Sequence, residues 1–186
     1  MSLQTKFGRL AAVLVLAVTA LAGRSHAQVL NSGASTITLQ AVLNDSLSVT
    51  LSGNAVNFNL TAGSANNPGS VAITATTTWI SKAGRNLSLY AFFANSATAL
   101  TDGAGDNIPS ADFQISDNAG PFNALTNTVP FGGANAGLTL FTHKITGTSK
   151  TGSTTDVMNF NINLSTLPNL PANTYTGTLT IQAQII

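Results

Sequence analysis

The sequence predicts an all-β fold, and three observations carry this prediction. Beyond the first 27 residues, no stretch shows helical periodicity. Short stretches recur in which apolar residues alternate with Thr, Ser, Asn or Gln, as expected for strands, whose side chains point to opposite faces in turn. Turn signals rich in Gly, Pro and Asn separate these stretches. We therefore expect eight or nine short strands and no helical layer.

The N-terminal segment 1–27 has the three-part order of an export signal. Two basic residues precede the apolar run 10–22, which is too short to span a bilayer comfortably, and a small-x-small pattern ends at Ala27. We expect cleavage before Gln28 and export by the general secretory route, to the periplasm, the cell surface or the extracellular space. No membrane association is expected after cleavage, because the chain has no cysteine to carry a lipid.

The composition of the mature segment 28–186 argues against several classes of protein. Four of the seven Lys and Arg residues remain there, against all six Asp, which gives a net charge of −2. With no basic patch, nucleic acid is not an expected partner. Only 7% of the whole chain is charged, whereas soluble proteins carry about a quarter charged residues. The 159 residues of this segment suit one domain with a sizeable core, and without cysteine that core must be held by burial alone.

The first strand pattern begins after a lead without periodicity, residues 28–35. Odd positions are apolar from Ile37 to Leu51, with Asp45 as the single polar exception. The pattern predicts either one long bent strand or two strands in tandem, with a bulge or a change of sheet near Asp45. Residues 28–44 are thus an N-terminal extension or a donor strand for another molecule.

The remaining strand patterns follow at short intervals. Met158, Phe160 and Ile162 alternate with asparagines, and Tyr175 to Ile185 alternate with Thr and Gln. Residues 147–155 are polar and are interpreted as a hairpin loop. The further expected strands cover residues 56–60, 71–79, 87–93, 112–116, 138–146, 158–164 and 175–186. This number of strands with uneven loops favours an immunoglobulin-like sandwich over a closed barrel.

Catalytic and metal-binding residues are scarce. The mature segment holds one histidine, His143, with apolar neighbours on its face, and neither cysteine nor glutamate. General acid–base catalysis and zinc binding both lack the residues they need, so we expect neither an enzyme nor a cofactor. Asp102, Asp106 and Asn107 lie in a glycine-rich loop and could supply oxygen ligands to Ca²⁺, but ordinary turns use the same residues.

Aromatic residues raise the alternative of glycan binding. Tyr90 and Phe92 point away from the face that carries Leu87 and Leu89, so they form either an exposed patch or a surface covered by a loop. Trp79 continues an apolar strand face and is expected in the core. A carbohydrate-binding adhesin domain that uses Tyr90, Phe92 and the loop around Asp102 is therefore the alternative function.

The end of the chain resembles a known family. Residues 170–181, LPANTYTGTLTI, are similar to the closing segment of the spore coat protein U domain and of related pilin-like domains, which belong with the chaperone–usher fimbrial subunits. Residues 56–58, VNF, fit a short apolar segment near the start of these domains. In this chain Asn59 and Asn173 stand where the family has glycine, and the common disulfide is missing.

The resemblance implies a pilin-like sandwich that lacks one strand, and a groove that accepts a strand from another molecule. It implies a secreted structural subunit of a fimbria- or coat-like surface assembly. The partners would be like subunits or a periplasmic chaperone, with surface glycans as the partners of the adhesin alternative. The expected assembly residues are Ile37, Leu39, Ala41 and Leu43 on the donor strand, and Tyr175, Gly177, Leu179 and Ile181 beside the groove.

Overall fold

The computed structural model describes residues 34–186. The expected signal peptide 1–27 and the expected mature start at Gln28 lie outside these residues. Residues 42–186 form one compact unit. Within the described residues, no helix has the length and apolar character that crossing a membrane requires.

The described chain is almost entirely β-structure, with eleven strands and one short 3₁₀ helix, η1. Three of the strands have only two residues, so eight are longer. The elements in order are β1 (Ser46–Leu51), β2 (Asn67–Pro68), β3 (Ile73–Ile80), β4 (Asn86–Phe92), β5 (Leu100–Thr101), β6 (Asn107–Ile108), η1 (Ser110–Asp112), β7 (Phe113–Asp117), β8 (Phe122–Ala124), β9 (Gly137–Lys144), β10 (Thr151–Ile162) and β11 (Thr180–Ile185).

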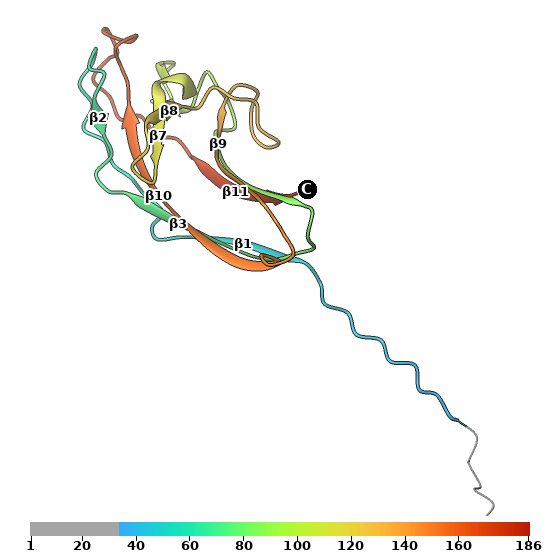
Figure 1. Ribbon diagram of the computed structural model, residues 1–186. Helices are drawn as coiled ribbons and strands as arrows, with labels where there is room; N and C mark the ends of the chain where they lie inside the picture. The colour runs from blue at the N-terminus through green and yellow to red at the C-terminus, as the bar shows by residue number, and fades with distance from the viewer. Residues whose placement is uncertain (1–33) are drawn as a thin grey trace, which may run out of the picture. The chain divides into compact units, whose positions relative to one another are not determined.

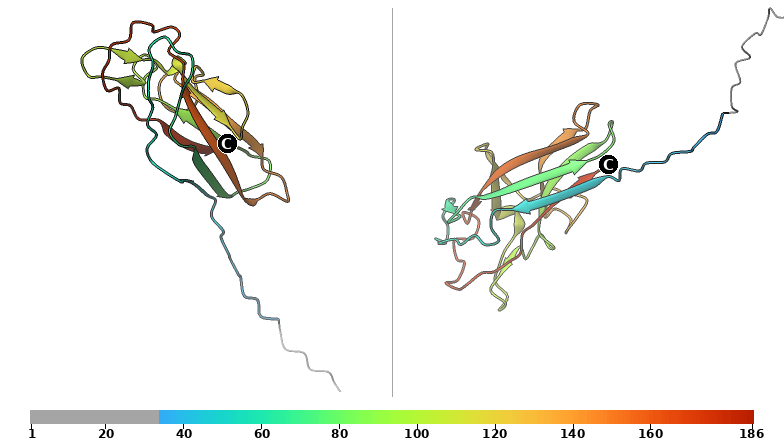
Figure 2. Two further views of the ribbon diagram at one scale, coloured as in Figure 1. Left: turned by 90° about the vertical axis from the view of Figure 1, so that its left-hand side faces the viewer. Right: turned by 90° about the horizontal axis from the view of Figure 1, so that it is seen from below.

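Two antiparallel sheets face each other, as in a β-sandwich (Figures 1 and 2). The larger sheet has the order β1-β3-β10-β7-β8, with β2 attached to β10, and the smaller has the order β11-β4-β9. Strands β5 and β6 form a separate pair. The all-β prediction is confirmed. In this topology β1 and β11 are edge strands of opposite sheets, and β9 is the other edge of the small sheet.

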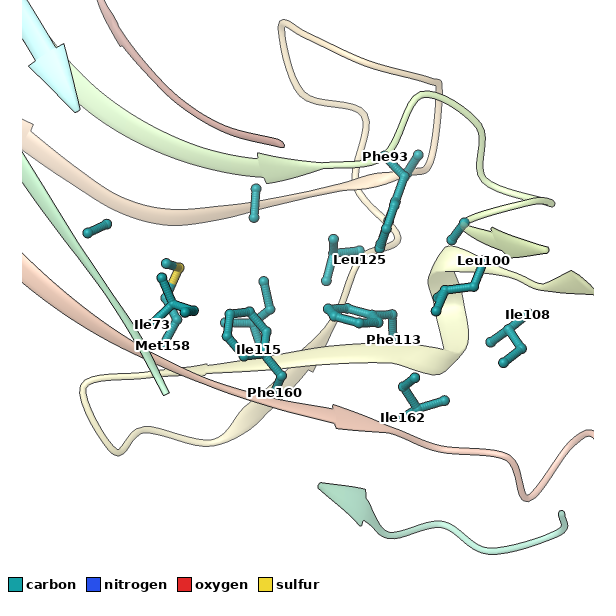
Figure 3. Packing of buried hydrophobic residues seen from close by; sticks show 14 of the residues in the cluster. Ile73, Phe93, Leu100, Ile108, Phe113, Ile115, Leu125, Met158, Phe160 and Ile162 are labelled. Atoms are coloured by element: carbon teal, nitrogen blue, oxygen red, sulfur yellow. The ribbon is translucent and has the colours of Figure 1, made fainter. Parts of the chain in front are cut away.

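The core fills the space between the two sheets. Ile115, Met158 and Ile162 from the larger sheet are completely buried, as is Leu89 from the smaller one. Figure 3 shows Phe93, Ile115 and Leu125 near Phe113, with Met158 further along the core beside Ile73. The ring of Phe113 meets Phe93 edge-on at 5.2 Å between ring centroids. Apolar burial at about 25 cal/mol per Å² is thus the main stabilising term, since no disulfide is present.

The loop before β9 covers Tyr90 and Phe92. Both side chains are 9% exposed, and Phe131 packs on them at centroid distances of 6.0 and 5.9 Å. Gly132 allows this close approach, because it has a φ of +77° and a Cβ there would overlap Phe92. Cover by a loop, rather than an exposed aromatic patch, therefore explains the two-sided apolar pattern of β4.

The connection between β9 and β10 differs from the predicted hairpin. These two strands belong to different sheets, and β10 pairs instead with β3 and β7. Residues 151–155, predicted as loop because they are polar, extend β10 opposite Thr76 to Ile80 of β3. A Thr- and Ser-rich strand has no apolar alternation to reveal it, so the sequence pattern failed there.

Three other strand predictions are longer than the strands observed. The structure has no strand in residues 36–45, so only the second half of the predicted first strand, β1, is formed. Residues 56–60 contain a single bridge, from Phe58 to Gly69. Residues 175–179 likewise contain only the bridge from Thr176 to Thr101, and β11 begins at Thr180. A strand pattern without a neighbouring strand forms no ladder.

Candidate functional site: a groove between the sheet edges

An open groove of about 730 Å³ lies between the β1 side of the larger sheet and the β11 side of the smaller one. One lip runs from Leu51, the last residue of β1, to Leu60. The other runs from Ala172 to Ile181, the second residue of β11. The two lips are the segments in which predicted strands are missing. The groove thus lies where both sheets have an unpaired edge.

The first lip turns its apolar side chains toward the interior. Val56, Phe58 and Leu60 alternate along it, are half-buried and pack against the core. The ring of Phe58 meets Phe113 edge-on at a centroid distance of 5.8 Å. Gly69 lets this lip lie close to β10, because a Cβ there would be 2.7 Å from Val56 and 3.3 Å from Phe160.

The second lip is held from behind by the β5–β6 hairpin. The backbones of Thr176 and Thr101 exchange two hydrogen bonds of 2.9 Å. Gly177 lies so close to the carbonyl group of Ala99 that a side chain there would overlap it. Asn173 donates a 2.9 Å hydrogen bond to the Asp102 carboxylate. These contacts occupy one edge of the lip and leave its other edge along the groove.

The floor of the groove is the core itself. Met158, Phe160 and Ile162 of β10 line it, together with Phe93 and Phe113. All five are at most 5% exposed, so the floor is apolar throughout. No titratable side chain lines the groove except Tyr175, whose hydroxyl donates to the carbonyl of Pro171 at 2.9 Å. The groove that residues 34–186 form can thus accept apolar side chains and backbone hydrogen bonds.

The groove closes at one end. There β1 and β11 contact each other, and Leu47 and Ile185 pack with Trp79 and Leu87 in a small second core. Trp79 is 6% exposed, which confirms it as a core residue. The groove is therefore open only along the stretch beyond this contact.

The four predicted residues of the second lip all line the groove. Tyr175, Leu179 and Ile181 are half-buried with their side chains against the core, and Gly177 gives the closest approach to the β5–β6 hairpin. The floor was not predicted from the sequence, because Met158 and Phe160 have the pattern of any buried strand. Leu51 and Val56 were not predicted as lip residues either, although the isolated alternation of residues 56–60 is a usable signal.

The predicted donor residues are exposed. Ile37, Leu39 and Leu43 are 84%, 88% and 81% exposed, and Ala41 is exposed as well. No residue between 34 and 45 belongs to a strand. The first side chain after this segment with a polar contact is Asp45, which forms an ion pair with Arg85 at 2.7 Å. Exposed apolar residues in alternation are unusual, since water contact at each costs free energy that burial would recover.

The Asp102 loop has a structural explanation. Oδ1 of Asp102 accepts hydrogen bonds from the backbone N–H groups of Ala104, Gly105 and Asp106 at 2.8–3.1 Å. These bonds, the first from Ala104, lower the pKa of the Asp102 carboxyl. Within residues 34–186 no group of three or more Asp, Glu, His or Cys side chains is arranged to bind a metal ion. The loop instead anchors the second lip through Asn173.

No family model, curated protein or solved structure matches this chain.

Proposed function

We propose that this protein is a secreted structural subunit that assembles by β-strand complementation: the groove of one molecule accepts an extended segment from another. The observation that carries the proposal is the pair of lips. Both have strand patterns and face one apolar groove, and no strand of residues 34–186 lies on the groove side of either. An added strand would complete both ladders at once, through backbone hydrogen bonds.

The donor segment we propose is residues 36–43 of a second copy. It carries apolar side chains at four alternating positions over seven residues, Ile37 to Leu43, roughly 20 Å of extended chain. The second lip also presents four alternating positions over seven residues, from Tyr175 to Ile181. The match in length and in period supports this donor over an unrelated peptide. A periplasmic chaperone would use the same groove before assembly.

We also propose that the domain is an immunoglobulin-like, pilin-like sandwich. A sandwich with open edges at β1 and β11 is what an immunoglobulin-like, pilin-like domain becomes when one strand is missing. The resemblance of residues 170–181 to spore coat protein U domains agrees with the position of the second lip. It also supports export to the periplasm or cell surface, and a role without catalysis.

The test compares the wild-type protein with the Leu39→Asp variant by size-exclusion chromatography with light scattering and by electron microscopy. We expect wild-type oligomers or filaments, and monomers for Leu39→Asp, because burying an unpaired carboxylate costs several kcal/mol. The matched control is Gln40→Asp, on the opposite face of the same segment, which should assemble normally. Gln40→Asp should unfold at the wild-type temperature, whereas Leu39→Asp should unfold at a lower temperature because no donated strand fills its groove.

Two outcomes contradict the proposal. Assembly by Leu39→Asp at the wild-type level would show that residues 36–43 are not the donor. A wild-type protein that stays monomeric at high concentration would show that the domain is self-complete. As a second measurement, a synthetic peptide of residues 36–43 should block assembly, and the same peptide with Asp in place of Leu39 should not.

The adhesin alternative has less support at the residues first considered for it. Tyr90 and Phe92 lie beneath Phe131 and leave no ring face free for a sugar. Asp102 uses its carboxylate within its own loop. Loss of glycan binding in Tyr90→Ala would restore this alternative.

A further inference from the structure

A second cleft, of about 470 Å³, lies on the other side of the two sheets. It separates the C-terminal half of β9 from the first half of β10, the part of β10 that pairs with β3 but not with β7. Its volume lies within the range of about 300–1,000 Å³ that small-ligand sites occupy. Unlike the groove, it is lined largely by Ser and Thr, with Trp79, Phe141, His143 and Asp156 among them.

Asp156 is the most unusual residue of this cleft. Its side chain lies on the inner face of β10 and the residue is only 3% exposed. Oδ1 accepts a 3.2 Å hydrogen bond from Asn118, but Oδ2 is buried and has no hydrogen-bond partner among the described residues. A buried carboxylate oxygen without a donor is costly, so such groups usually meet a ligand or water.

Two further polar atoms nearby are in the same condition. His143 lines the cleft, and its Nε2 is buried without a partner among residues 34–186. Thr77 lies on the inner face of β3, opposite Thr154 of the cleft, and its Oγ1 is also buried without a partner there. Asp156 and His143 thus bring two unpartnered polar atoms to the lining of one cleft, where the rings of Trp79 and His143 have centroids 5.6 Å apart, and Thr77 adds a third such atom on the neighbouring strand.

We propose that this cleft binds an uncharged saccharide, of the size of a mono- or disaccharide. Sugar hydroxyls both donate and accept, which suits a carboxylate oxygen, an imidazole nitrogen and the surrounding Thr and Ser hydroxyls. The half-buried ring of Phe141 offers an apolar surface for the C–H face of a sugar. Asp156 and the adjacent Asp117 repel anionic ligands, and no three metal-ligating side chains group together in the described chain.

The site is separate from the proposed strand groove. Trp79, His143 and Asp156 line only the cleft, and none of the groove lips reaches it. Saccharide binding can therefore fail while strand complementation holds, and the reverse is equally true. Together they would describe a structural subunit that displays a glycan site along its assembly.

The single tryptophan makes the test specific, because Trp79 is the only one in the chain and lies in the cleft. The experiment titrates the full-length protein with N-acetylglucosamine, methyl α-mannoside, methyl β-galactoside and lactose, and records tryptophan fluorescence. We expect a saturable change with at least one of these sugars. A sodium chloride titration at equal osmolality controls for bulk solvent effects.

Two variants locate the binding. Asp156→Asn keeps the shape of the side chain but replaces an acceptor by a donor, and should weaken binding about 10- to 100-fold. Thr154→Val removes one hydroxyl at constant size, and keeps the test decisive should Asp156→Asn fold poorly. Asp106→Asn makes the same chemical change on an exposed loop outside the cleft and should leave binding unchanged.

Three results would overturn the proposal. The first is that none of the four sugars causes a saturable change in fluorescence, and the second is that both cleft variants still bind sugar with full affinity. The third is a fluorescence response to Ca²⁺ or methylammonium with which the sugars do not compete. The last would mark the carboxylates as a cation site. Equal or higher thermal stability of Asp156→Asn together with lost sugar binding would separate a ligand-binding role from a structural one.

Discussion

The two openings between the sheets differ in what lines them. The groove beside β1 and β11 has an apolar floor and lips with unpaired backbone edges, whereas the cleft between β9 and β10 has a hydroxyl-rich lining and buried polar atoms without partners. The first demands a long, regular partner that supplies backbone hydrogen bonds along both edges. The second demands a compact partner that supplies a few hydrogen bonds at fixed points. Under the two proposals, one scaffold would thus separate assembly from ligand binding by the polarity of its two openings.

The largest effect is expected from a charge in the apolar groove. Ile181→Asp should abolish assembly and also lower the free energy of unfolding by several kcal/mol, because this half-buried side chain packs against the core. Gln182→Asp, one residue further and exposed, should assemble and unfold like the wild type. Light scattering and thermal unfolding measure both. Equal behaviour of the two variants would mean that the groove is not an assembly surface.

The second lip can be displaced without adding a charge. Gly177→Ala would place a methyl group against the Ala99 carbonyl, and because backbone must move, we expect a loss of about 1–3 kcal/mol in unfolding free energy and weaker assembly. Gly147→Ala is the matched control, since no atom lies within 4 Å of its added methyl group. Sugar-induced fluorescence changes should survive in Gly177→Ala; their loss would show that the two openings are coupled.

A glycine-to-alanine substitution on the other side of the molecule tests the cleft. Gly152→Ala would place a methyl group against the buried ring of Trp79, so the ring, rather than the backbone, must move. We expect a loss of about 1 kcal/mol, a changed tryptophan emission and weaker sugar binding, with assembly unchanged. Normal sugar binding with a shifted emission spectrum would show that the position of the Trp79 ring does not matter for the ligand.

The smallest expected effect is a pH dependence of stability caused by the buried carboxyl groups in and beside the cleft. Burial raises the pKa of the Asp156 carboxyl above its usual 3.8. The pKa of the Asp117 carboxyl is also raised, mainly by burial and to a smaller extent by the nearby Asp156 charge. Because the folded state then holds these protons more tightly, stability should rise as pH falls from neutral toward about 3.8. Asp156→Asn should reduce this rise and increase the Tm at neutral pH by a few degrees. Thermal unfolding across this pH range tests both, and an unchanged slope in the variant would remove Asp156 as the cause.

The sequence predicted the strands in which apolar residues alternate, but not those whose formation depends on pairing with an adjacent strand. The strands β3 and β11 were predictable because apolar residues alternate along the face that packs inward, and β4 because its whole length is apolar or small. The polar first half of β10 was not predictable, because Thr and Ser on an edge also describe a loop. Residues 56–60 and 175–179 have strand patterns but form no ladder, since pairing depends on a strand that local sequence cannot reveal.

The candidate sites follow the same division. The groove residues Tyr175 to Ile181 were identified from a pattern and a resemblance, and the structure places them on one lip. The cleft around Asp156 was invisible, because its members come from β3, β9 and β10 and share no motif. Only the fold brings Trp79 next to His143 and leaves an oxygen of Asp156 without a donor.

The ion pair between Asp45 and Arg85 has a mechanical consequence for an assembly of the proposed kind. The donor face ends at Leu43, and only Asn44 separates it from Asp45. The six residue pairs that join β1 to β3 begin at the next residue, Ser46. Tension along such a filament would pass through a single residue of slack into β1 and pull that strand along its own length. The rungs between β1 and β3 would then share the force in shear instead of opening one after another. The chain would thus transmit pulling forces between subunits with little stretch.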